Sequence, residues 1–353
     1  MANWSETMEQ SFEYYIVDPG TWKDVEPLDN VKKCTINRDD TVDTLGSATI
    51  DITDSVGECY IRVYLITIQN GLKEKHPLGT FLVQTPSSTF DGKKRDVTMD
   101  AYTPLLELKE NQPPLGYSIF KGENIMLNAY RIVRERMRAP VFETISEKTL
   151  HGDFVANTDD TWLTFVKDLV SNAKYYLGLD ELGRVLFLPK QDTASLQPVW
   201  TYNDDDKSIL YADITVNHDL YDVPNVVEVI YSNGQDSYHK RVVNDDPNSP
   251  VSTVNRGREK VYRVTNPDVV GSDPTKGEIQ QYAEQLLEDL STLEYTITYK
   301  HGYCPVRLGD CVRINYSKAG LNGVKAKVIS QSISCTAGCQ VTEKAVFTEK
   351  LWG

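Results

Sequence analysis

The sequence lacks the local motifs by which many enzymes and nucleotide-binding proteins are recognised. No GxSxG, HExxH, GxxxxGK or GxGxxG segment occurs, and no EF-hand loop is present. No CxxC pair occurs either, and the histidines are scattered rather than spaced as a metal-binding pair. Because so many signatures are absent together, the sequence predicts a protein that is not an enzyme and needs no cofactor.

Long apolar runs and positive charge are also in short supply. No stretch of about 18 apolar residues exists, so the sequence predicts no membrane insertion. The first ten residues, MANWSETMEQ, lack a basic segment followed by an apolar one, so we expect no signal peptide. The chain has 37 Lys and Arg against 51 Asp and Glu, a net charge of −14. Such an acidic chain has no general attraction for phosphate backbones, which disfavours an ordinary nucleic-acid-binding protein.

Six cysteines are too few in 353 residues for a disulfide scaffold. Four of them lie close together in the sequence near its end: Cys304, Cys311, Cys335 and Cys339. Free, buried thiols are the favoured interpretation of this cysteine cluster. A disulfide across the TAG segment between Cys335 and Cys339 is sterically feasible. Zinc is the third alternative, although the C-x6-C and C-x3-C spacings are unusual for it, and we predict no essential metal.

Hydrophobic residues make up 40% of the 353 residues, enough for cores in two or three domains. We interpret residues 1–30 as an extended arm. Over residues 31–110 the pattern has a period of two, as in the half-buried segment 48–52. Asn70-Gly71 and Asp91-Gly92 are typical of turns between antiparallel strands. We therefore predict a first small β-barrel domain over 31–110, since closure removes exposed strand edges.

Residues 111–203 change character and predict an α/β module. Apolar residues recur at helical spacing over 122–138, and a hairpin turns at Gly183. The polar side of the first helix carries four arginines in an otherwise acidic chain: Arg131, Arg134, Arg136 and Arg138. A solvated helix face is the plain interpretation of these arginines, and a docking surface for an acidic partner is the sharper one.

A second helix of this module is predicted over residues 161–174. Its apolar residues fall on one stripe, and Asp159 or Asp160 is suited to cap its start. We expect the stripe to pack on the following hairpin, near Leu186 and Leu188.

Residues 204–353 return to strand patterns and predict a second β-barrel domain. A hairpin turn is expected at Asn233-Gly234, and a helix at about 275–290 with Asp273 as cap and Pro274 as its first residue. Asp204-Asp205-Asp206 resembles half a metal site but is better interpreted as a solvated turn. The predicted fold class is therefore α+β, mainly β: two small antiparallel β-barrel domains separated by a helix-plus-hairpin α/β module.

The order of these features resembles the baseplate hub family of tailed phages and contractile injection systems. The likeness covers about residues 25–353 and depends on the succession of segments, none of which is specific alone. The segments are LGTFLVQT followed by VTMDAYTPLLEL, then DDTWLTFVKDLVSNAKYYLGLDELGRVLFLP, SILYADITVNHDLYDVPNVVEVIYSNG, IQQYAEQLLEDL and PVRLGDCV.

This resemblance implies a homotrimer whose two barrels per chain form a pseudo-sixfold ring. Such a ring would adapt a hexameric tail tube protein to a spike protein, contact other baseplate proteins and line a channel for DNA. The expected location is the baseplate of a virion tail, assembled in the host cytoplasm. The net charge of −14 suits an acidic channel wall that does not retain passing DNA.

Two alternatives remain open from the sequence. A tail-tip protein of a long, non-contractile tail would contain similar barrels. A two-domain carbohydrate-active enzyme or binding protein is the alternative from another class. An exposed cleft lined by tryptophans with paired carboxylates would favour it, although Trp162 lies on the apolar helix stripe and is expected in a core. The candidates for that cleft are Trp22, Trp162 and Trp200.

Overall fold

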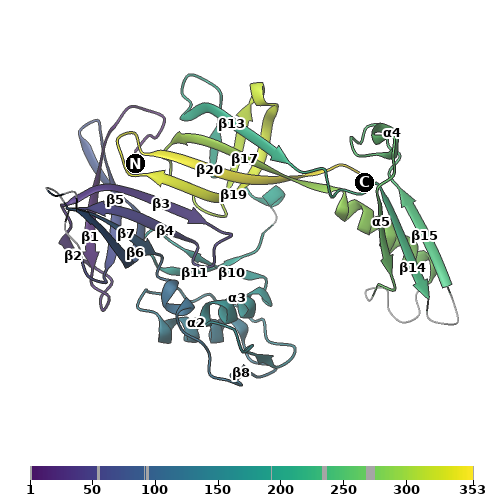
Figure 1. The fold of residues 1–353 in the computed structure, drawn as a ribbon, viewed down its shortest axis with the longest axis horizontal. Coiled ribbons are helices and arrows are strands. Elements are labelled where there is room, and N and C mark those ends of the chain that lie inside the picture. Colours follow the sequence, from purple (N-terminus) through teal and green to yellow (C-terminus); the bar gives the residue numbers. More distant parts are fainter. Residues whose placement is uncertain are drawn as a thin grey trace. The chain divides into compact units, whose positions relative to one another are not determined.

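The computed structural model describes residues 2–53, 56–90, 92, 95–191, 193–232, 237–267 and 275–352 (Figure 1). Strands account for 46% of the residues and helices for 15%, so the predicted class, α+β and mainly β, is confirmed. The predicted turns at Asn233-Gly234, at Asp91 and at Asp273-Pro274 lie outside the described residues.

Strands from both ends of the chain form one sheet. Its order is β13-β17-β20-β19-β3-β4-β7-β6-β5-β1-β2, with β18 pairing β19 and β12. The early strands are β1 (Glu9–Val17), β2 (Asp24–Pro27), β3 (Val31–Asp39), β4 (Gly46–Ile52), β5 (Tyr60–Gln69), β6 (Leu72–Phe90) and β7 (Arg95–Tyr102). The later strands are β12 (Trp200–Tyr202), β13 (Leu210–His218), β17 (Thr292–Gly302), β18 (Cys311–Tyr316), β19 (Leu321–Ser334) and β20 (Gln340–Lys350).

The expectation of two separate closed barrels is wrong for the described strands. Their pairing follows an open path from β13 to β2, and β3 pairs antiparallel with β19, with Ile36 opposite Ile333. Period-two patterns identified these strands, but such patterns do not determine which strands become neighbours. The β3–β19 pairing, which we call the seam, joins the two strand-rich ends of the chain into a single sheet.

Alternation of side chains explains how this sheet forms its core. In β4 the alternate residues Ala48, Ile50 and Ile52 are buried, as predicted. Strand β5 lies between β1 and β6 and is buried on both faces from Tyr60 to Thr67, with Ile61, Val63 and Leu65 in one apolar core and Tyr60 in another. The predicted arm therefore contributes to the sheet, since β1 pairs with β5 along its whole length.

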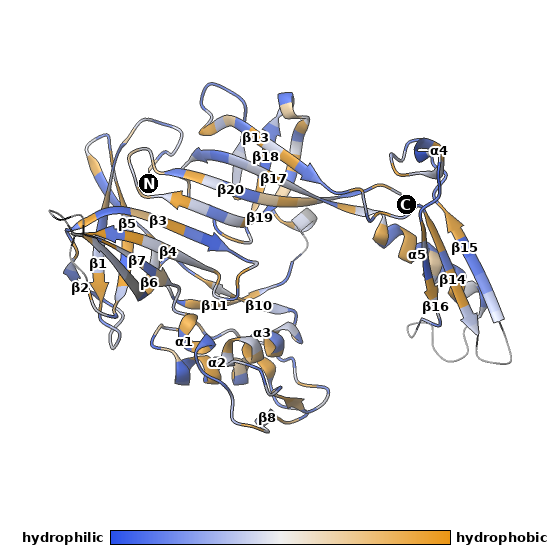
Figure 2. Cartoon of the chain, viewed as in Figure 1, coloured by the Kyte–Doolittle hydropathy of each residue, from blue (hydrophilic) through white to orange (hydrophobic). Residues whose placement is uncertain are grey.

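In the described part of the chain, the α/β module consists of helices, the hairpin β10–β11 and a short antiparallel pair, β8 with β9, which are far apart in the sequence (Figure 1). Its elements are α1 (Leu106–Lys109), β8 (Ser118–Ile119), α2 (Ile125–Arg136), β9 (Phe154–Val155), α3 (Trp162–Ser171), β10 (Tyr175–Leu179) and β11 (Val185–Pro189). Both α2 and α3 carry hydrophobic and hydrophilic residues in turn (Figure 2). Their buried sides share one apolar core, because helices of this length depend on burying an apolar face for stability.

Two details of α3 differ from the sequence-based expectation. Its N-cap is Thr161, not Asp159 or Asp160: Thr161 and Thr164 form a capping box in which each side chain accepts the other's backbone N–H. The helix packs on the face of β10–β11 that carries Val185 and Phe187. Leu186 and Leu188 lie on the opposite face, because successive residues of a strand point to opposite sides.

By its internal contacts the chain divides into two compact units, residues 1–214 with 299–345, and residues 215–298 with 346–353. The second unit contains the three-stranded sheet β15-β14-β16, formed by β15 (Ser237–Val243), β14 (Val226–Ser232) and β16 (Val261–Thr265), and the short helix α4 (Thr253–Arg256). Helix α5 (Lys276–Leu290) packs on this sheet through Ile279, Ala283 and Leu287, and its N-cap is Thr275. The domain boundaries expected from the sequence remain predictions.

Candidate functional site

Three of the four predicted docking arginines lie on the exposed outer side of the α/β module. Arg131 and Arg134 project from α2, and Arg138 follows two residues after the helix ends. Arg134 lies over the ring of Tyr130, with 5.9 Å between guanidinium carbon and ring centre. The backbone N–H of Arg138 donates to Glu107 at 2.7 Å, and its guanidinium lies 3.9 Å from the same carboxylate.

Arg136 differs from these three arginines because it is only partly exposed and packs on a core residue of the module. Its guanidinium stacks on the Trp162 ring at 3.7 Å from the ring centre. It also donates to the carbonyl of Ile132 at 3.4 Å and forms an ion pair with Glu135 at 3.1 Å. An arginine in this position covers an aromatic ring and contributes to the packing of α2 against α3.

The structure does not bring the four predicted cysteines into one group. Cys335 joins Cys34 and Cys339 in the core near the seam, and its backbone N–H donates to the Cys34 carbonyl at 3.0 Å. All six cysteines are free in the structure. Burial raises the pKa of the Cys339 thiol, as it does that of Cys311, which makes both poor nucleophiles. Cys34 is 270 residues or more from every cysteine of the predicted cluster, so no local spacing pointed to it.

Cys304 belongs instead to a fully buried polar cluster, which the sequence did not predict. We define this cluster as Tyr202, Tyr299, His301, Cys304, Gln331 and Glu343. The Glu343 carboxylate accepts hydrogen bonds from the hydroxyls of Tyr299 and Tyr202 and from the Gln331 amide nitrogen at 2.5 Å. Gln331 in turn accepts from Arg38 at 3.0 Å, and Arg38 donates to the Leu78 carbonyl at 2.7 Å. The chain of bonds therefore crosses the seam.

His301 is the titrating group in this cluster. Its Nδ1 lies 2.7 Å from the Gly302 carbonyl, which accepts a hydrogen bond from that nitrogen, and its Nε2 lies 3.5 Å from Glu343. Burial by itself would lower the pKa of His301, but its contacts with Cys304 and Glu343 outweigh burial and raise the pKa to about 10. The exposed fraction of both His301 and Glu343 is 0%, so a substrate has no access to the pair. We therefore expect the pair to affect the free energy of unfolding.

A cavity of about 850 Å³ lies between the outer face of hairpin β10–β11 and the sheet. Its lining includes Leu186 and Leu188 from the hairpin and Leu78 from the sheet. Burial raises the pKa of Asp40 and of Asp310 in its wall, although Lys327 lies 3.6 Å from Asp40. Because its lining mixes charged and apolar side chains, this cavity does not point to one class of ligand.

The tip of hairpin β10–β11 is a junction of several segments. The carbonyl of Leu182 accepts from Trp22 Nε1 at 2.8 Å and from the buried Arg62 at 3.3 Å. Glu181 forms an ion pair with Arg307 at 2.5 Å. The turn needs glycine at position 183, where φ is +73° and a Cβ would lie 2.8 Å from Thr80. The turn of the hairpin, residues 180–183, thus packs against the strands and loops around it.

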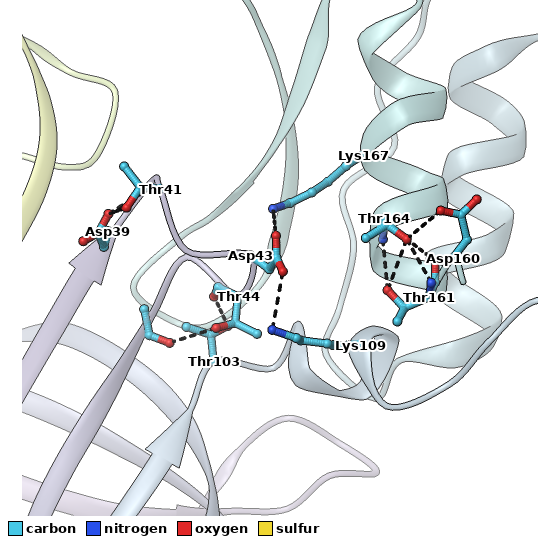
Figure 3. A network of polar contacts seen from close by, with 11 residues as sticks. Asp39, Thr41, Asp43, Thr44, Thr103, Lys109, Asp160, Thr161, Thr164 and Lys167 are labelled. Atoms are coloured by element: carbon cyan, nitrogen blue, oxygen red, sulfur yellow. Dashed lines mark hydrogen bonds and ion pairs between the residues drawn. The ribbon is translucent and has the colours of Figure 1, made fainter. Parts of the chain in front are cut away.

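A second junction fixes the module against the β3–β4 connection (Figure 3). The carboxylate of Asp43 lies 3.4 Å from Lys109 of α1 and 3.4 Å from Lys167 of α3. Burial opposes ionisation of Asp43, but the two lysines outweigh it and lower its pKa. Figure 3 also shows Asp160 accepting from Thr164 beside the α3 cap. One loop carboxylate therefore contacts both α1 and α3.

The tryptophans and aspartates that the sequence suggested for a sugar-binding cleft or a metal site lie in ordinary core and turn positions. Trp22 and Trp162 are buried in the module's core and Trp200 is half-buried on β12, so they do not line an exposed cleft. Asp204 accepts two hydrogen bonds from Ser317, which lowers its pKa, and Asp205 accepts from the Lys207 backbone.

Among the described residues, no three His, Cys, Asp or Glu side chains are grouped to hold a metal ion. No helix of that same part of the chain has the length and apolarity needed to span a bilayer.

Comparison with solved structures identifies the fold. A tail protein from Neisseria meningitidis matches 96% of this chain and 97% of its own, with a TM-score of 0.61 and 12% identity. The 43 kDa tail protein of prophage MuSo2 from Shewanella oneidensis matches 95% of this chain and 98% of its own, with a TM-score of 0.62 and 11% identity. An Escherichia coli component of the type VI secretion system matches 92% of this chain and 75% of its own, with a TM-score of 0.51 and 10% identity.

The chain therefore has the fold of phage tail proteins, and the resemblance predicted from the sequence is confirmed at the level of fold. No protein-family model matches the sequence, and no curated protein matches it.

Proposed function

We propose that the protein is a structural, non-enzymatic component of a phage-type tail. The observation that carries this proposal is the match to two tail proteins, one of them from a prophage, over nearly the whole of both chains. Near-complete coverage in both directions argues for a shared architecture rather than one borrowed domain. Fold alone does not determine function, so the role needs its own experimental test.

Within that class we propose a baseplate hub: a homotrimeric ring between the tail tube protein and the spike protein, in contact with other baseplate proteins. The buried Trp22 and Trp162 remove the main support for a carbohydrate-binding cleft. A tail-tip protein of a non-contractile tail is the nearest alternative, and the presence of a sheath on the particle separates the two. The expected location is the virion tail, assembled in the host cytoplasm.

The test of the ring is the mass of the purified protein. A chain of 39.9 kDa gives a trimer of about 120 kDa by light scattering. The measurement is made over a dilution series, with the protein alone and with candidate tail tube and spike proteins. A monomer under all these conditions contradicts the ring.

We further propose that DNA passes through the ring and that the wall of its channel is acidic. The net charge of −14 per chain supplies an excess of carboxylates, which repel a duplex over the Debye length of about 8 Å at physiological salt. An image of the assembled ring tests this directly. A wall lined mainly by lysine and arginine, or a ring without a channel, contradicts the mechanism.

A further inference from the structure

The outer side of α2 carries one continuous row of exposed residues. Leu127, Arg131, Arg134 and Arg138 follow each other at spacings of four, three and four residues, which places the three in the helix on one side of it. Leu127 is 38% exposed although it is apolar. We call this row the arginine face. The opposite side of α2 is buried against α3 through residues such as Met126, Ala129 and Val133.

The charge of this face is not balanced within the described part of the chain. Arg131 has no carboxylate partner among the described contacts, and Arg134 contacts the ring of Tyr130. Arg138 lies near Glu107, but that carboxylate already accepts from Tyr60 at 2.5 Å and from a backbone N–H. Residues 125–138 contain four arginines and one glutamate, a local charge of +3 in a chain of −14.

The helix dipole explains only part of this row. Cations in the last turn of a helix interact favourably with its carboxyl end, which accounts for Arg134 and Arg136. Arg131 lies before the last turn and Arg138 lies after the helix, so neither gains much from the dipole. Like charges three residues apart, such as Arg131 and Arg134, repel each other.

We propose that the arginine face docks a carboxylate-bearing helix or loop of another protein. Guanidinium groups form paired, charge-assisted hydrogen bonds with carboxylates, and these bonds are stronger than those between neutral groups. The exposed Leu127 gives the partner an apolar contact, which a phosphate backbone would not use. The overall charge of −14 also repels nucleic acid, so a protein surface is the better match. The inference goes beyond the proposed ring because it requires no particular number of subunits.

The probe is a fluorescent helical peptide with glutamates four residues apart and leucines between them, measured by anisotropy with the full chain. Arg131→Gln, Arg134→Gln and Arg138→Gln are combined in one variant. We expect this variant to bind the peptide about tenfold or more weakly, since each tenfold loss corresponds to about 1.4 kcal/mol. Leu127→Ser alone should weaken binding by about threefold, and added salt should weaken binding to the wild type.

A matched control removes three positive charges elsewhere, through Lys33→Gln, Lys207→Gln and Arg258→Gln, all at exposed positions. It should bind the peptide within about twofold of the wild type. An equal loss in this control would mean that only net charge matters and would overturn the inference. Binding of a DNA duplex through the same three arginines, more tightly than the peptide, would also overturn it. So would failure of the wild type to bind the acidic peptide.

Circular dichroism shows whether the variants fold, and the light-scattering mass separates the two proposals. A variant that keeps the wild-type mass but loses the peptide supports the arginine face without bearing on the ring. A monomeric wild type that still binds the peptide through these arginines contradicts the ring but supports the arginine face as a docking surface.

Discussion

Two regions of the first unit are held together by different physical means. The α/β module has an apolar core in which α3 and the hairpin bury side chains such as Trp162, Phe165 and Phe187. The polar cluster beside the seam instead buries a carboxylate, an imidazole and two tyrosine hydroxyls. An apolar core tolerates adjustment, whereas a buried polar cluster is costly as soon as one partner is lost. The seam should therefore be the more sensitive region to single changes.

The largest effect is expected for Glu343→Ala in the polar cluster. Removal of this carboxylate leaves two tyrosine hydroxyls, the Gln331 amide and His301 without their shared partner. Breaking a buried pair in this way costs about 3–5 kcal/mol of unfolding free energy, and we expect the upper part of that range. Urea unfolding measures it, with Glu294→Ala at an exposed position as control. A loss of unfolding free energy below about 1 kcal/mol for Glu343→Ala would contradict the expectation that the polar cluster is more sensitive to substitution than the module.

Trp162→Ala tests the module with a change of similar size but apolar character. The ring is 4% exposed, packs edge-on against Tyr117 and carries the guanidinium of Arg136. Loss of a buried tryptophan costs about 3–5 kcal/mol, and we expect the lower part of that range because neighbouring apolar side chains can move in. Leu115→Ala, in the same module but 87% exposed, should change stability by about 0.5 kcal/mol or less.

Gly183→Ala probes the junction that connects the module to the sheet. The added methyl group meets Thr80 at 2.8 Å and Pro104 at 3.2 Å, and φ is +73°. Strain and crowding together should cost about 1–3 kcal/mol. Gly116→Ala is a matched control, because φ is +76° there with open space around the new Cβ. The difference between the two melting temperatures reports the packing cost alone, and equal shifts would mean that the tip is not tightly docked.

The last expected effect is a pH dependence confined to the polar cluster. A histidine whose pKa is raised to about 10 contributes stability that is fully present below its unfolded value of about 6.5. That contribution is lost as pH rises through about 10. NMR of labelled histidines should show the His301 ring protonated at neutral pH, while burial lowers the pKa of His76 and provides an internal comparison. A His301 signal that titrates near 6.5 would show that the contacts do not outweigh burial.

The sequence predicted the module better than the seam, for a physical reason. The stripe of α3 recurs at helical spacing, so its buried face could be inferred from neighbours in sequence. Which face of the following hairpin it contacts could not be inferred, and Leu186 and Leu188 were expected where Val185 and Phe187 lie. The four arginines were found as a group, but the stacking of Arg136 on Trp162 depends on how α2 meets α3.

The polar cluster and the cysteine group near the seam had no such local signal. Glu343 and Tyr202 are 141 residues apart, and Cys34 and Cys335 meet only because β3 pairs with β19. Nothing in the sequence around Glu343 distinguishes it from the other acidic residues, 51 in all, so its burial could not be predicted. Strand partners, and with them the choice between closed barrels and one open sheet, are decided by contacts between distant segments.

The seam has a consequence for how the chain is made. During synthesis β3 finds its partner β4 at once, but its other edge stays unpaired until Ile333 and its neighbours have been added almost 300 residues later. Pairings between such distant segments form slowly, and an unpaired strand edge invites association with other chains. A polypeptide cut short before β19 would therefore keep a permanently open edge beside an apolar core. By pairing with β3, strand β19 near the end of the chain removes an exposed strand edge through which the early strands could aggregate.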